Sequence, residues 1–168
     1  LFRSPDSGRL WTANTRTVNA DALPIIGDGG YDLGARSKQI RDNLFALERF
    51  TADDLFAIQL DHRAIFFTHW HTLLLDLLKQ SKRTETTERL EQVLKDWDGR
   101  AAADSVAYRI VRGFRHEVIR AILTALTVDV RQAHPAYQLP RLNQAEHAVW
   151  RILEERPAHL LPANYDNW

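Results

Sequence analysis

The distribution of glycine divides this chain into two parts of different character. Five of the seven glycines lie within the first 34 residues, at positions 8, 27, 29, 30 and 34, and this segment has little helical periodicity. We expect a strand over residues 10–18, followed by a loop. From residue 35 onward, apolar residues recur at spacings of three and four, which is typical of amphipathic helices. The sequence therefore predicts a mainly α protein, an antiparallel helical assembly over 35–168 preceded by a short β and loop segment over 1–34.

Capping patterns and apolar stripes locate the first helices. Ile40 and Leu44 open a stripe that predicts a helix beginning near residue 35. Thr51 and Asp54 form a capping pattern, because the threonine oxygen can accept a hydrogen bond from the third amide of the helix. The apolar positions behind this cap stay on one side for about five turns. We therefore expect one long helix from Thr51 to the polar stretch that begins at Lys79.

Three more helices are expected in the second half of the chain. The first spans about 88–97 and stops at an Asp-Gly pair. The second begins with Asp104 as its cap and ends before Pro135. Asn143 and Glu146 form another capping box, which opens a last helix that runs to about Glu155.

Composition excludes several classes of partner. The 22 basic and 22 acidic residues cancel, so no overall field selects nucleic acid or an anionic membrane. The longest apolar runs are too short to span a bilayer, and we expect neither nucleic acid nor a membrane as a partner. With no cysteine, the chain has no disulfide, thiolate nucleophile or cysteine-ligated metal. It begins at Leu1 and contains no methionine, so we expect a processed chain or a piece of a larger protein.

The best candidates for chemistry are two polar residues in the first quarter of the chain. Asn14 closes a short apolar run, and Arg36 opens a helix after a glycine-rich loop. Their separation of 22 positions along the chain allows a strand, a loop and a return. The two side chains can therefore meet at one site. For Asn14 taken alone, an ordinary structural amide is the commoner interpretation.

Other motifs have ordinary structural explanations. The glycine-rich loop at 27–34 lacks the Gly-Lys-Ser/Thr ending of a P-loop, and we interpret it as a turn rather than a phosphate cradle. His62 and His69 lie two turns apart on the expected helix, roughly 10 Å, which is too far for one metal ion, and His71 points elsewhere. We interpret these histidines as polar residues packed at a helix-helix seam, and we expect no metal site. No serine lies in a nucleophile elbow.

Three segments resemble the penicillin acylase (penicillin amidase) family: residues 27–44, residues 50–61 and the end of the chain, 156–168. The resemblance spans essentially the whole chain and falls in the interior of the family's large β subunit. That family belongs to the N-terminal nucleophile hydrolases. The resemblance therefore implies that this chain is part of a larger αββα fold, in which residues 1–34 belong to the catalytic core and residues 35–168 form a helical domain.

The resemblance also implies a mechanism. A precursor of this family cleaves itself and exposes a serine as the new N-terminus of the large subunit, and the α-amino group of that serine serves as its base during attack on an amide carbonyl. By its place in Thr12-Ala-Asn14, Asn14 matches the asparagine that holds the oxyanion, and Arg36 matches an arginine that orients polar groups and substrate. No residue here can be the serine, so we expect the isolated chain to hydrolyse nothing.

The partners implied by the resemblance are a small-molecule amide substrate and the remaining α and β subunit segments of the parent enzyme. Catalysis in the family requires no cofactor. A structural calcium ion can bind in the parent, with Asp21, Asp28 and Asp32 in the right part of this chain and most ligands elsewhere. The implied location is the periplasm, or outside the cell. The alternative is a non-catalytic helical scaffold or interaction module, which the absence of an upstream serine would favour.

Overall fold

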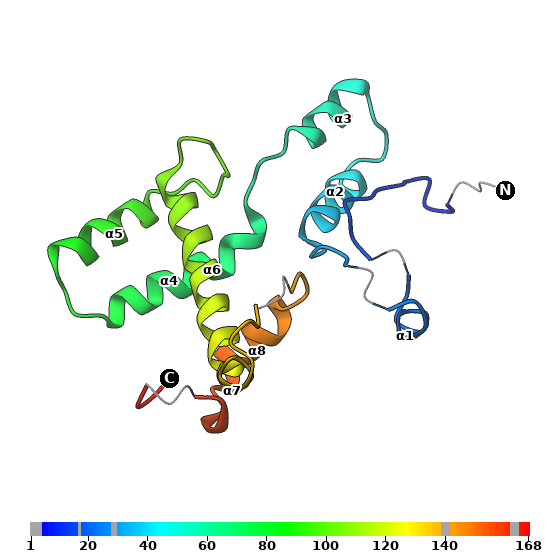
Figure 1. Cartoon of the computed structure of the whole chain (residues 1–168). Helices are drawn as coiled ribbons and strands as arrows, with labels where there is room; N and C mark the ends of the chain where they lie inside the picture. Colours follow the sequence, from blue (N-terminus) through cyan, green and yellow to red (C-terminus); the bar gives the residue numbers. More distant parts are fainter. Residues whose placement is uncertain (1–4, 17, 28–29, 139–141, 162–164) are drawn as a thin grey trace. The chain divides into compact units, whose positions relative to one another are not determined.

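The computed structural model describes residues 5–16, 18–27, 30–138, 142–161 and 165–168 (Figure 1). The chain divides into two compact units, Leu1–Asp61 and His62–Trp168. The prediction of a mainly α protein is confirmed. The described residues contain eight α-helices and two short 3-10 helices: α1 Leu23–Ile26, α2 Ala35–Phe45, α3 Ala52–Gln59, η1 Ile65–Phe67, α4 Thr68–Gln80, α5 Glu85–Lys95, α6 Val106–Leu126, α7 Val128–Ala133, α8 Glu146–Glu155 and η2 Ala158–Leu160.

The strand expected over residues 10–18 is wrong for the described part of that segment, which is irregular. Asn14 has a φ of 58°, in the left-handed region, and this backbone cannot continue a strand. The segment is anchored instead on the end of α2. The Arg9 guanidinium donates to the carbonyl oxygens of Leu44 (Nε, 2.9 Å) and Leu47, and its Cζ lies 5.0 Å from the Phe45 ring centroid.

The first unit packs α2 against α3. Asp61, the last residue of this unit, accepts hydrogen bonds from the side chains of Gln39 (2.8 Å) and Asn43 (2.7 Å) on α2. The capping box at the start of α3 is confirmed, because Thr51 Oγ1 accepts from the Asp54 amide while the Asp54 carboxylate accepts from the Thr51 amide.

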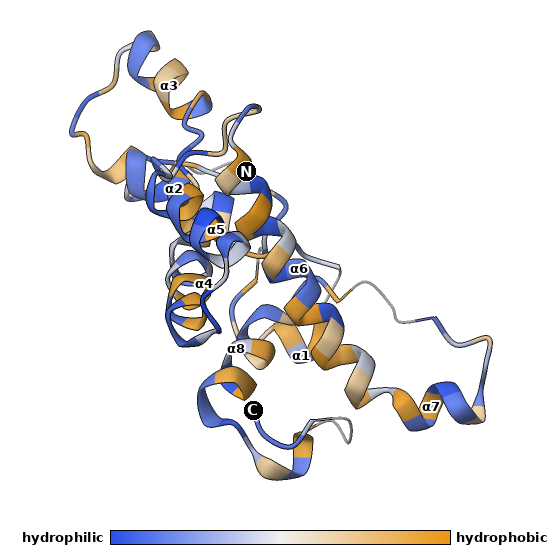
Figure 2. Ribbon diagram, turned by 90° about the vertical axis from the view of Figure 1, so that its left-hand side faces the viewer, coloured by the Kyte–Doolittle hydropathy of each residue, from blue (hydrophilic) through white to orange (hydrophobic). Residues whose placement is uncertain are grey.

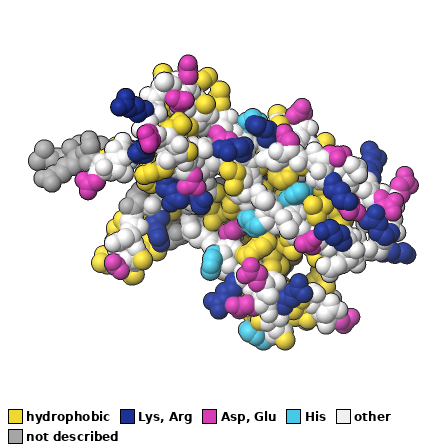
Figure 3. All heavy atoms as spheres, turned by 180° about the vertical axis from the view of Figure 1, so that it is seen from behind, with side chains coloured by type: hydrophobic (Ala, Val, Ile, Leu, Met, Phe, Trp, Pro, Cys, Tyr) yellow, Lys and Arg dark blue, Asp and Glu magenta, His cyan; other side chains and the backbone are white. Residues whose placement is uncertain are grey.

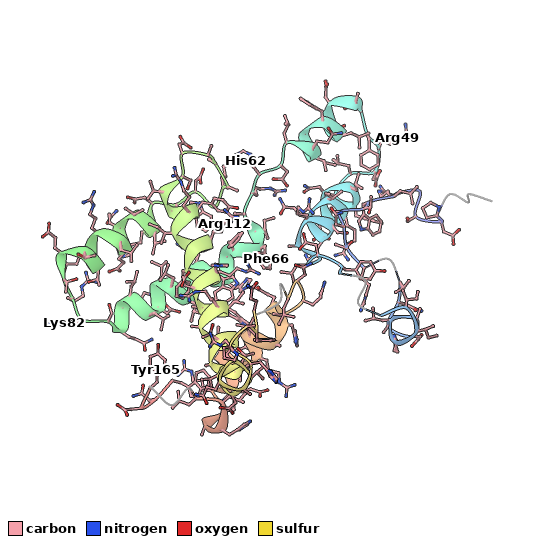
Figure 4. The ribbon with its side chains drawn as sticks, in the orientation of Figure 1. Arg49, His62, Phe66, Lys82, Arg112 and Tyr165 are labelled. Carbon is pink, nitrogen blue, oxygen red and sulfur yellow. The ribbon has the colours of Figure 1, made fainter. Side chains whose placement is uncertain are left out.

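The single long helix expected from Thr51 to the polar stretch at Lys79 is wrong, because α3 ends at Gln59 and α4 begins at Thr68. The backbone between them pairs with a distant segment. Ala64 donates to the Gly99 carbonyl (2.7 Å), and Ala101 donates to the carbonyl of His62 (2.8 Å), the residue labelled where the chain enters the second unit in Figure 4. Backbone groups used in this short antiparallel bridge are unavailable for helical hydrogen bonds.

The core of the second unit lies among α4, α5, α6 and α8. Helix α4 packs against α5 and α6, and α6 packs against α8. Each of these helices contributes one fully buried side chain: Trp70, Leu94, Val111 and Val149. Figure 2 shows the alternation of apolar and polar residues along α6 that this packing requires.

The ends of these helices differ from the predictions in detail. Helix α5 begins at Glu85 rather than near residue 88, because Thr84 and Thr87 form a capping box. Ser105, not Asp104, caps α6 and accepts from the Tyr108 amide. The helix expected to run toward Pro135 is divided at Thr127 into α6 and α7.

The capping box predicted at Asn143 and Glu146 is wrong. Ala145 is the N-cap of α8 and makes no side-chain hydrogen bond to the helix. The reason is that the Glu146 carboxylate is buried and accepts instead from Trp70 on α4 and Arg115 on α6. The end of this helix agrees with the prediction, since α8 stops at Glu155 and Arg156 adopts a left-handed conformation.

Candidate active site

Asn14 and Arg36, the two residues singled out in the sequence, are in contact. Arg36 lies in the first turn of α2, and its Nη2 donates to the Asn14 side-chain oxygen Oδ1 at 3.2 Å. The same nitrogen lies 3.4 Å from the Ala13 carbonyl oxygen. The prediction that the two side chains meet is therefore confirmed. Their catalytic roles stay a prediction.

Asp32 contacts both members of the pair, which sequence reasoning missed. Its backbone amide donates to the Asn14 carbonyl oxygen at 2.8 Å, and its Oδ2 accepts from Arg36 Nη2 at 3.4 Å. Its other oxygen, Oδ1, accepts from the Leu33 amide at 2.9 Å. The signal that could have found it is the spacing of four residues between Asp32, which precedes the helix, and Arg36 in its first turn.

The site is open at the surface of this chain. Asn14 and Arg36 are exposed, and the Arg36–Asp32 ion pair has side-chain exposures of 62% and 45%. An exposed amide and guanidinium can bind a ligand without any rearrangement of a core. Over the face in Figure 3, acidic and basic side chains are interspersed, in keeping with the zero net charge.

Two of the described glycines in the loop before α2 have a left-handed backbone. Gly27 and Gly30 have φ values of 81° and 69°, which L side chains rarely adopt, and Gly34 is the N-cap of α2. Asp28 and Gly29 lie outside the described residues. Gly27 and Gly30 thus have a structural reason to be glycine.

The interpretation of the histidines as polar residues at a helix-helix seam is confirmed for His69 and His71 and is wrong for His62, which is exposed and lies between α3 and η1. His71 Nε2 is 2.9 Å from the Leu94 carbonyl oxygen, which joins α4 to α5. His69 Nε2 is 3.6 Å from Glu146 Oε1, and its ring meets the Trp150 ring edge-on at 4.6 Å. Burial lowers the pKa of His69, and Arg115 adds to this effect, while Glu146 opposes it.

A buried carboxylate joins three helices of this unit. Glu146 on α8 accepts from the indole nitrogen of Trp70 and from Nε of Arg115 (2.9 Å), whose Cζ lies 5.2 Å from the ring centroid of Phe66. Phe66, labelled in Figure 4, belongs to η1 directly before α4. Because every polar group named here has a partner within the protein, the cluster is structural.

A second carboxylate, Glu91, connects α5 to the loop that precedes it. It lies 2.5 Å from Arg83 and 2.6 Å from Lys95, and these hydrogen bonds lower the pKa of Glu91 to about 2. No three His, Asp or Glu side chains within the described residues form a group that could hold a metal ion. Of the calcium candidates, Asp21 is exposed and Asp32 is engaged as described above.

Comparison with known proteins agrees with the resemblance seen in the sequence. The family model described as penicillin amidase matches residues 2–165. The chain belongs to the penicillin amidase family. It is 29% identical over 149 residues to the penicillin acylase 2 proenzyme of Pseudomonas sp. (strain SE83). That match covers 87% of this chain but 18% of the relative, so the chain spans less than a fifth of that protein's length. No solved structure matches.

In the part of the chain that the structure describes, no helix is both long and apolar enough to cross a bilayer.

Proposed function

We propose that this chain is one part of an amide-hydrolysing acylase. In this proposal, Asn14 donates a hydrogen bond to the oxyanion of the tetrahedral intermediate, and Arg36 orients the Asn14 side chain. The observation that carries the proposal is the hydrogen bond from Arg36 Nη2 to Asn14 Oδ1. Membership of the penicillin amidase family supports the reaction class.

The contact fixes which end of the Asn14 amide is available. A primary amide has one oxygen that accepts and one NH₂ group that donates. Since Arg36 occupies the oxygen, the NH₂ group lies at the opposite end of the side chain, where it can donate to a ligand. A donor held before the reaction begins stabilises developing negative charge without the cost of reorganising at that moment.

Arg36 contributes charge as well as orientation. Its guanidinium is always protonated and stands one hydrogen bond from the proposed oxyanion donor. A positive charge at that separation favours the intermediate over the neutral substrate, which is the condition for faster chemistry.

The nucleophile in this proposal is a serine outside the chain, exposed when a precursor cleaves itself, and its α-amino group serves as base. The matched relative is named as a proenzyme, which supports a precursor. We expect the purified 168-residue chain to show no acylase turnover, and turnover by that chain would contradict the assignment. An upstream sequence lacking a serine after a small residue would favour the non-catalytic scaffold.

Further segments of the parent enzyme are proposed to cover part of the first unit. Apolar side chains are exposed there, including Leu10 at 68%, Ile25 at 86% and Phe45 at 50%. The relative is about five times longer than the stretch it shares with this chain, so it has sequence enough to cover them. The proposed substrate is a small amide, linear or lactam-bearing, the proposed location is the periplasm, and any structural calcium would take most of its ligands from those other segments.

The test is an alanine substitution of Asn14 in the processed parent enzyme. Loss of one oxyanion donor lowers kcat by about 10²- to 10³-fold, with processing unchanged. Asn19→Ala is the matched control, because the Asn19 side chain accepts from the Ala22 amide (3.0 Å) and has no part in the site. If Asn14→Ala keeps kcat within a few-fold of the unaltered enzyme, as Asn19→Ala is expected to do, the role of Asn14 is wrong.

A further inference from the structure

We infer that Asp32 is a positioning residue for this site: it holds Asn14 through its backbone and Arg36 through its carboxylate, and so sets the direction of the Asn14 amide. The inference rests on the proposed function of Asn14 and Arg36. It assigns to Asp32 no contact with substrate.

The side chain of Asp32 contacts Arg36, the member of the pair that carries charge. Nη2 of Arg36 has two hydrogens and three oxygens within reach, those of Ala13, Asn14 and Asp32. The Asp32 carboxylate draws the guanidinium to the position from which it also reaches Asn14 Oδ1. The carboxylate is itself held, since its second oxygen accepts from the Leu33 amide. The chain of contacts therefore runs from Asp32 through Arg36 to Asn14.

The backbone of Asp32 contacts Asn14 directly. A non-glycine residue at a φ of 58° is less favourable than one in an extended or helical conformation, and local hydrogen bonds must hold it. The Asp32 amide supplies one, to the Asn14 carbonyl oxygen at 2.8 Å. This bond survives replacement of the side chain. Substitutions of Asp32 therefore remove the contacts of its carboxylate, including those with Arg36 and the Leu33 amide, and leave this backbone bond in place.

The same contacts bear on the calcium expectation for Asp32. Each carboxylate oxygen already accepts a hydrogen bond, one from an amide and one from a guanidinium. A cation bound to this carboxylate would displace Arg36 or be repelled by its positive charge. We therefore assign the carboxylate to Arg36 and not to a metal ion.

The experiment uses the processed parent enzyme and a double-mutant cycle between Asp32 and Arg36. Asp32→Ala is expected to lower kcat by about 2- to 5-fold with little change in KM, the range for an exposed ion pair. Asp32→Asn keeps an acceptor oxygen and should recover part of that loss. In an Arg36→Ala background, Asp32→Ala should have no further effect, because its side chain acts through Arg36.

Asp42→Ala is the matched control. Asp42 has the same side-chain exposure as Asp32, 45%, and also pairs with basic side chains of α2, Lys38 and Arg41, but it does not contact the site. It should leave kcat and KM unchanged. An equal loss in Asp42→Ala would mean that any broken ion pair on this helix has the same effect, and would overturn the inference.

Three further outcomes separate this inference from the proposed function. Additive losses in Asp32→Ala and Arg36→Ala, with Asn14→Ala still strongly impaired, overturn the role of Asp32 and leave the proposed function intact. Full turnover in Asn14→Ala overturns both. Recovery of kcat in Asp32→Ala on addition of excess calcium chloride would assign the carboxylate to a cation, and the inference would be wrong.

Discussion

Replacing Glu146 tests whether one buried carboxylate holds the second unit together. Glu146 has 8% of its surface exposed and accepts from Trp70 on α4 and Arg115 on α6, while it belongs itself to α8. Glu146→Ala leaves the fully buried indole N–H of Trp70 without an acceptor and separates the Arg115 charge from its partner. We expect this variant to be among the most destabilising single changes in the chain.

The size of the effect follows from burial. An unsatisfied buried N–H costs about 1–3 kcal/mol. Breaking a fully buried ion pair costs about 3–5 kcal/mol, but the Arg115 side chain is 23% exposed, so water replaces part of that loss. Together these give about 3 kcal/mol for Glu146→Ala. Glu146→Gln keeps an oxygen for Trp70 and should lose about half as much, since the charge alone is removed.

The assay is equilibrium urea unfolding of the 168-residue chain, followed by tryptophan fluorescence. With a slope of about 2 kcal/mol per molar urea, a loss of 3 kcal/mol lowers the midpoint by about 1.5 M. Glu117→Ala is the matched control on α6, because Glu117 pairs with Arg120 at the surface, where such pairs contribute little. Equal midpoints for Glu146→Ala and Glu117→Ala would refute the reasoning.

Three further predictions concern pH and helix capping. Burial lowers the pKa of His69 below its ordinary value near 6.5, so the unfolded chain binds a proton at this residue more tightly than the folded chain does. The stability of the folded chain should therefore fall as pH drops below about 6.5. In thermal unfolding, His69→Gln should lack this part of the pH dependence. The contribution of Glu91, whose pKa is about 2 in the folded chain, should be lost only as pH falls below about 4.5. Thr51→Ala removes the cap of α3, worth about 1 kcal/mol, and amide hydrogen exchange in that helix should become about 5-fold faster, whereas an unchanged rate would mean that the cap contributes nothing.

Periodicity and capping predicted most of the helices because these signals are local. Thr51 with Asp54 and the stripe of α2 depend on residues a few positions apart, and both are confirmed. Two of the errors came from contacts between distant residues. Residues near His62 pair with residues near Gly99, which divides the expected long helix, and Glu146 is drawn away from its capping role by Trp70 and Arg115.

The candidate site was predicted in the same uneven way. The sequence allowed Asn14 and Arg36 to meet, and they do. It contained no signal for the left-handed conformation of Asn14, because a hydrogen bond from the backbone amide of Asp32, 18 residues away, holds that conformation. The hydrogen bonds from Arg9 to the carbonyls at the end of α2 also could not be predicted, since guanidinium–carbonyl contacts leave no pattern in a sequence.

The central claim, that Asn14 stabilises an oxyanion, is tested most directly by comparing two affinities in the processed parent enzyme. One is the inhibition constant of a tetrahedral phosphonate analogue of the substrate, and the other is the KM of the substrate itself. An interaction made mainly in the transition state should weaken the analogue in Asn14→Ala by about 10²- to 10³-fold while KM changes by a few-fold at most. Equal weakening of analogue and substrate, or no weakening of either, would contradict the account.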